Sequence, residues 1–301
     1  MLIGLDFGVL LYEFGPAALV RIAKRAEECG FGLIACGDHL ILPDVLPLRD
    51  TAHLDKPVSS VSEATLTSRR IFRQGAPMPD VFQWFTYMAA ATKRIAFATA
   101  IYVLPVRHPL VVARAAATFD YLSEGRLFLG VGAGWIPGEF EIAGMDFKNR
   151  GRRMNESIRV MRELWEKETP QFSGEFFSFP PARFEPKPVQ KGGIPIMIGG
   201  ESPAALRRAA TLGDGWCGRI HTPESLREHV ARLREQRHAA GREHSRFIVQ
   251  CRIDPTITAA EVKALHQSGA EQMIVAFRAP NDEAGFMLEI ERIAARLLAR
   301  A

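Results

Sequence analysis

Cysteine is scarce in this sequence, and the few cysteines are not spaced to bind a metal. Cys29, Cys36, Cys217 and Cys251 are the only four, and they form no Cys-x-x-Cys pair and no cluster with histidine at the spacing of zinc ligands. A chain of 301 residues can bury a large apolar core without cross-links. We therefore expect reduced thiols, a cytoplasmic location and no structural metal.

Long apolar runs and blocks of like charge are absent as well. No stretch approaches the ~20 apolar residues that cross a bilayer, and the segment Met1–Gly8 lacks the basic start of a signal peptide and contains Asp6. The 38 basic and 34 acidic residues are interspersed and give a formal charge of +4. This spread is typical of solvated helix faces, so the sequence predicts neither membrane insertion nor nucleic-acid binding.

What the sequence does contain is a regular alternation of short apolar runs and amphipathic stretches. The runs that predict strands are Leu2–Gly8, Gly32–Cys36, Ile95–Tyr102, Arg126–Gly132, Ile194–Gly199, Gly215–Arg219, Phe247–Ile253 and Glu271–Phe277. Their nearly continuous hydrophobicity indicates burial on both faces, as in a parallel sheet. Eight such units predict an α/β fold: a single-domain (β/α)8 TIM barrel over residues 1–301.

Two segments interrupt this alternation. Residues 42–78, after the second predicted strand, are rich in Pro, Ser, Thr and Arg and have no clear period; a loop of this length often covers an active site. Residues 169–193, before the fifth predicted strand, alternate aromatic and polar residues around Gly174. They predict a hairpin followed by an extended, proline-rich arm. We interpret both segments as insertions in one barrel.

The carboxyl ends of the predicted strands carry the candidate functional residues, because active sites of TIM barrels form there. Asp38 and His39 follow the second strand, and the fourth to sixth carry "GVGAGW", "IGGESP" and "GDGWCG". Glycine lets the backbone come close to a bound group, and other acid–base groups are few, which suits a cofactor that brings its own reactivity. The Ser-Pro helix start in "IGGESPAAL" fits either an ordinary capped turn or a phosphate site.

Several long motifs resemble the luciferase-like flavin and deazaflavin oxidoreductases. They are "GDHL", "TKRIAFATAIYVLPVRHPLVVARAAATFDYLSEGRLFLGVGAGW", "GRRMNESIRVMRELW" and "IPIMIGGESPAALRRAATLGDGW". The resemblance covers most of residues 2–220 and is greatest to the branch that uses the deazaflavin coenzyme F420. It implies a barrel that binds F420, or alternatively FMN, at its carboxyl-end mouth, and it implies a homodimer.

The same resemblance assigns roles to individual residues. His39 would be the catalytic residue next to the reacting carbon, and a non-prolyl cis peptide at Ala100–Ile101 would support the ring. The residues expected to contact the cofactor, from the resemblance or from their places near strand ends, are Asp38, Ala100, Ile101, Gly134, Trp135, Gly199, Gly200, Ser202, Gly215 and Trp216. Asp38 would orient the His39 ring or favour its protonated form, or else cap a helix.

These observations leave three functions open. The first is an F420-dependent oxidoreductase that transfers a hydride between the deazaflavin and a small organic substrate, with His39 as proton donor or acceptor. The second is an FMN-dependent monooxygenase that receives reduced flavin from a separate reductase. The third is a flavin-binding barrel without catalysis. Cofactor binding and substrate turnover distinguish them.

Overall fold

The computed structural model describes residues 1–7, 14–43, 78–276 and 282–298. The first predicted insertion, residues 42–78, lies almost wholly outside the described residues.

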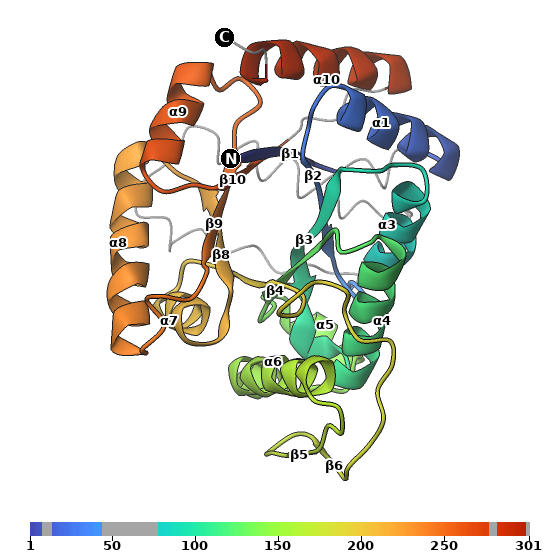
Figure 1. Cartoon of the computed structure of the whole chain (residues 1–301), viewed down its shortest axis with the longest axis vertical. Coiled ribbons are helices and arrows are strands. Elements are labelled where there is room, and N and C mark those ends of the chain that lie inside the picture. The colour runs from blue at the N-terminus through green and yellow to red at the C-terminus, as the bar shows by residue number, and fades with distance from the viewer. Residues whose placement is uncertain (8–13, 44–77, 277–281, 299–301) are drawn as a thin grey trace.

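Eight parallel strands close into a barrel in the order β1-β10-β9-β8-β7-β4-β3-β2 (Figure 1). They are β1 (Leu2–Asp6), β2 (Leu33–Asp38), β3 (Ala96–Val103), β4 (Leu127–Gly132), β7 (Ile196–Gly199), β8 (Gly215–Ile220), β9 (Ile248–Ile253) and β10 (Gln272–Val275). Each coincides with a predicted strand to within two residues at either end. The TIM barrel predicted from the sequence is therefore confirmed.

Helices surround this barrel (Figure 1). They are α1 (Pro16–Glu28), α3 (Val81–Ala89), α4 (Pro109–Leu122), α5 (Pro137–Ile142), α6 (Arg150–Glu166), α7 (Pro203–Leu212), α8 (Pro223–Ala239), α9 (Ala259–Gln267) and α10 (Glu283–Leu297), with short 3-10 turns at Leu104–Val106 and Phe147–Asn149. Five of these helices, α1, α4, α5, α7 and α8, begin with proline, whose fixed φ suits the first helical position and whose missing N–H has no helical partner there. Ion pairs from Arg21 to Glu283 and from Arg25 to Glu291 join α1 to α10.

The second predicted insertion forms a small antiparallel hairpin, β5 (Phe172–Ser173) and β6 (Ser178–Phe179), which projects beyond α6 in Figure 1. The buried Glu156 carboxylate of α6 holds its turn by accepting hydrogen bonds from the backbone N–H groups of residues 175, 176 and 177 at 2.9, 2.7 and 2.7 Å. An arm without strands or helices follows from residue 180 to residue 195. The predicted hairpin and arm are thus confirmed.

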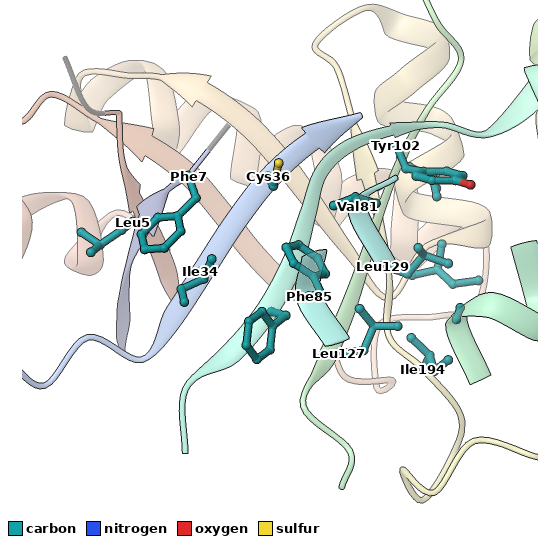
Figure 2. Close-up of a cluster of buried hydrophobic side chains, with 14 of the residues drawn as sticks. Leu5, Phe7, Ile34, Cys36, Val81, Phe85, Tyr102, Leu127, Leu129 and Ile194 are labelled. Atoms are coloured by element: carbon teal, nitrogen blue, oxygen red, sulfur yellow. The ribbon is translucent and has the colours of Figure 1, made fainter. Parts of the chain in front are cut away.

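The core lies both inside the barrel and between the strands and their helices. Figure 2 shows part of it, including Leu5, Ile34 and Leu129 of the strands. The rings of Phe85 and Phe97, from α3 and β3, lie 5.2 Å apart, and all five of these side chains are inaccessible to solvent. Packing of this density fixes the strands relative to one another, so the residues at their carboxyl ends are held by a rigid scaffold.

Candidate active site

His39 and a buried glutamate form a hydrogen-bonded pair at the carboxyl-end mouth of the barrel. His39 directly follows β2, and its Nδ1 lies 2.9 Å from Oε2 of Glu139, in the first turn of α5. The other carboxylate oxygen of Glu139 accepts a hydrogen bond from the backbone N–H of Leu40 at 2.8 Å. Since Glu139 has no solvent exposure, its carboxylate both orients the imidazole and fixes the chain that follows β2.

This pairing determines which ring nitrogen can exchange a proton. A carboxylate acceptor keeps a proton on Nδ1 of His39, so proton transfer to or from a bound molecule falls to Nε2. The His39 side chain is 16% exposed, and it therefore remains within reach of the mouth. The structure thus places His39 at the mouth, directly after β2, and its role as proton donor or acceptor stays a prediction.

Trp135 lies beside this pair. Its ring is edge-on to the His39 ring, with centroids 6.5 Å apart and an angle of 81° between the planes. The preceding Gly134 has φ +80° and passes over the ring of Phe140 so closely that a Cβ would lie 2.7 Å from it. Only glycine fits this turn without strain, and the turn places Trp135 beside His39. The two predicted neighbours of the cofactor ring are thus next to the predicted catalytic residue.

Asp38 pairs with an arginine that the sequence did not single out. Its Oδ2 accepts a hydrogen bond from Nη2 of Arg107 at 2.6 Å, and both side chains are almost buried. The Arg107 guanidinium also lies over the Tyr102 ring, 4.2 Å from its centroid. The expectation that Asp38 orients His39 is therefore wrong, because Glu139 takes that role and the Asp38 carboxyl accepts a hydrogen bond from Arg107.

Burial gives Asp38 an unusual affinity for protons. It raises the pKa of the Asp38 carboxyl to about 7, with a smaller contribution from the charges of Asp80 and Glu139, and the cations Arg107 and His39 offset it only in part. A carboxyl with this pKa changes its charge near neutral pH.

Replacing this carboxyl is expected to change how stability depends on pH. Because the folded protein binds the Asp38 proton more tightly than the unfolded chain does, the contribution of Asp38 to stability should fall as the pH rises from about 4 to about 7. Asp38→Asn removes this contribution, so the wild type should lose about 3 kcal/mol of stability relative to the variant between these pH values. Urea unfolding followed by circular dichroism measures this. Parallel pH profiles for the two proteins would contradict it.

A cis peptide bond joins Ala100 and Ile101 in β3, at the position that the family resemblance implies. The carbonyl oxygen of Ala100 accepts a hydrogen bond from Nη2 of Arg252 on β9 at 2.8 Å. Arg252 also forms an ion pair with Asp6, at the carboxyl end of β1. Arg252 and Asp6 were missed in the sequence, although a charged residue inside an apolar strand is itself a signal.

The glycines of β4 and β7 make room for a side chain of the protein. A Cβ on Gly132 or Gly199 would lie 2.8 or 2.7 Å from the side chain of Ile101. Their missing side chains are therefore explained by packing inside the barrel. This corrects the prediction for Gly199, because its missing side chain leaves space for Ile101 and not for a bound group.

The start of α7 is a capped helix N-terminus preceded by a glycine with positive φ. Gly200 has φ +112°, and Ser202 accepts a hydrogen bond from the N–H of Ala205 at 3.2 Å. The Glu201 carboxylate accepts from the N–H of Arg219 at 2.8 Å and lies 3.0 Å from Nε2 of His221. Burial alone would raise the pKa of Glu201, but His221 and the Arg219 N–H outweigh it, so this pKa lies below its usual value.

Trp216 and Gly215 do not lie at the mouth. Trp216 is completely buried, donates its indole N–H to the carbonyl of Gly200 at 2.8 Å, and stacks on the ring of His229 in α8. Gly215 is the first residue of β8, at the opposite end of the barrel from the mouth, and packs against Met197. The prediction that these two residues contact a cofactor is therefore wrong.

A cavity of about 470 Å³ lies at the amino ends of β1 to β4. Its lining includes Leu2, Glu27, Gly32 and Arg126, so it is separate from the mouth.

In the part of the chain that the structure describes, no helix has both the length and the hydrophobicity that a membrane span requires.

The residues at the mouth suit an anionic redox cofactor in their chemistry. The first turn of α7 presents backbone N–H groups beside a glycine of positive φ, which suits a phosphate. Arg252 is paired with Asp6, but its guanidinium stays about one-third exposed. His39, held by Glu139, supplies one group for proton transfer. The fold and the site thus define a TIM barrel of the enzyme type, with its acid–base group at the carboxyl ends of the strands.

The chain belongs to the luciferase-like monooxygenase family, whose sequence profile matches residues 4–300. It is 31% identical over 208 residues to the F420-dependent glucose-6-phosphate dehydrogenase of Amycolatopsis mediterranei, a match that covers 68% of this chain and 54% of that protein. The matched segment is therefore about two thirds of this chain and about half of that relative.

Two solved structures share the fold over nearly the whole chain. The monooxygenase RslO1 from Streptomyces bottropensis superposes with a TM-score of 0.77 at 19% identity, over 99% of both chains. An F420-dependent secondary alcohol dehydrogenase, solved with an F420–acetone adduct, gives a TM-score of 0.75 at 19% identity, over 98% of this chain and 99% of that chain. Identities this low show a common barrel and no more.

Proposed function

We propose that this protein is an F420-dependent oxidoreductase that transfers a hydride between the deazaflavin and a small organic substrate. The observation that carries the proposal is the His39–Glu139 pair at the mouth, with 2.9 Å between Nδ1 and Oε2. The 31% identity to an F420-dependent dehydrogenase supports the choice of cofactor. When bound, the deazaflavin would supply or accept the hydride.

The protein's own residues hold the reactants and move the proton. His39 exchanges a proton with the substrate through Nε2, while Glu139 keeps the ring in position and in the tautomer with Nδ1 protonated. The Ala100–Ile101 peptide, whose carbonyl is fixed by Arg252, and the Gly134–Trp135 turn would border the ring. The first turn of α7 would hold the phosphate.

An FMN-dependent monooxygenase is the second candidate, because the family profile that matches residues 4–300 is that of luciferase-like monooxygenases. It would use the same mouth but depend on oxygen and on a separate flavin reductase. The homodimer and the cytoplasmic location that the sequence predicts stay predictions for either function.

Titration of the purified protein with each cofactor separates the two candidates. We expect F420 to bind at micromolar concentration or below. The absorbance of the oxidised cofactor should change when an alcohol is added as hydride donor, and that of the reduced cofactor when an aldehyde is added as hydride acceptor. FMN should bind more weakly and give no oxygen uptake. Tight FMN binding with oxygen-dependent turnover, and no response to F420, would show that the monooxygenase is correct.

A further inference from the structure

Three arginines gather where α6 and α7 begin. Arg150 is the first residue of α6, and Arg207 and Arg208 lie in the second turn of α7. The guanidinium of Arg208 reaches across to α6, where it donates to Oδ1 of Asn155 at 2.5 Å and to the carbonyl of Gly151 at 3.3 Å. These contacts place the Arg208 guanidinium beside the start of α6, and Arg150 and Arg207 lie close enough for their charges to act on it.

No carboxylate neutralises this group within the ranges that the structure describes. The acceptors of Arg208 are an amide and a backbone carbonyl, and Arg150 donates to the carbonyl of Phe147 and lies over its ring, 3.8 Å from the centroid. Burial, together with the charges of Arg150 and Arg207, lowers the pKa of Arg208 below its usual value. By contrast, the nearby Arg152 is paired with Glu175. Among the residues that the structure describes, the cluster is thus a positive patch without a paired carboxylate.

The patch lies on the same side of the barrel as His39. Helix α7 begins just after the carboxyl end of β7, and α6 begins in the segment that connects β4 to the hairpin. Helical side chains lean toward the helix N-terminus, so Arg207 and Arg208 lean toward Ser202 and the mouth. The positive ends of both helix dipoles add to the field of the three cations.

We propose that Arg150, Arg207 and Arg208 form a docking site for the anionic tail of the cofactor. This inference rests on the proposed function, because F420 carries a phosphodiester and several carboxylates beyond its ring, whereas FMN ends in one phosphate. Guanidinium groups pair with carboxylates and phosphates through parallel N–H bonds. The patch therefore gives this chain a way to prefer the tailed deazaflavin over FMN.

The test compares three deazaflavins that share one ring. They are the ring with its ribityl chain alone, the cofactor truncated after its phosphodiester, and F420 with its full carboxylate tail. Binding is measured by fluorescence titration for the wild type and for the double variant Arg150→Gln/Arg207→Gln, which spares the interhelical contacts of Arg208. The matched control is Arg232→Gln, on the exposed face of α8.

We expect the double variant to bind full F420 about tenfold more weakly, while its affinity for the tail-free ring changes less than about twofold. Raising the salt concentration should weaken the binding of F420 to the wild type and reduce the difference in F420 affinity between the wild type and the double variant. The truncated compound shows the source of the attraction: a loss there equal to that for F420 assigns the arginines to the phosphodiester, and a smaller loss assigns them to the carboxylates.

Other outcomes overturn the inference and separate it from the proposed function. If the wild type binds all three deazaflavins and the double variant binds them equally well, the docking site is wrong and the cofactor assignment stands. Equal losses for all three compounds would show that the arginines support the fold instead. If the wild type binds none of them, the proposed function and this inference fail together.

Discussion

His39→Ala is expected to lower the turnover of F420 and substrate by about 10²- to 10⁴-fold, the range over which a positioned general acid or base acts. The imidazole is the group through which Nε2 would exchange a proton with the substrate. Affinity for F420 should change by less than about threefold, since the variant keeps the α7 N-terminus and Arg252. Stopped-flow absorbance of the deazaflavin measures turnover, and a titration measures binding.

The control for this variant is His244→Ala, because the His244 side chain is 97% exposed. His244→Ala should leave the turnover and the affinity for F420 unchanged. If His39→Ala retained full turnover, a different group would have to move the proton. If the wild type bound F420 but no alcohol, aldehyde or enone changed its redox state, the non-catalytic barrel would be the correct function.

The strands and the barrel could be predicted from the sequence because their signal is local. A strand buried on both faces needs an apolar residue at nearly every position, as in "LIACGD" of β2, and the helices between strands have their own start signals. His108 shows the same locality: it precedes Pro109 and caps α4 by accepting from the N–H of Leu110. The histidine at the end of β2 was found in the same way.

The partners of that histidine could not be predicted, because they come from distant parts of the chain. Glu139 lies 100 residues from His39 along the chain. The same holds for the cis peptide, because Arg252, which donates to the carbonyl of Ala100, lies 152 residues from it. The prediction for Trp216 failed for a related reason. Successive side chains of a strand face opposite ways; Cys217 contacts Gln250 of the neighbouring β9, whereas Trp216 faces α8. The interpretation of Gly132 and Gly199 failed because the side chain that fills the space beside them, Ile101, belongs to another strand.

Glu139→Gln tests the pair itself and should have the second largest effect, a loss of turnover of about 10²-fold. The amide can still accept from the N–H of Leu40, but its NH₂ group can turn toward Nδ1 of His39 and favour the other tautomer, with the proton on Nε2. Binding of F420 and the unfolding midpoint should change little, because the side-chain volume is preserved.

The double variant His39→Ala/Glu139→Gln provides the sharper measurement. If Glu139 acts only through His39, the double variant should be no slower than His39→Ala alone, because residues that act as one unit show strongly non-additive effects. Stopped-flow turnover of the four proteins gives the coupling directly. A double variant slower than the wild type by the product of the two separate losses would show that Glu139 acts on the substrate or cofactor independently of His39.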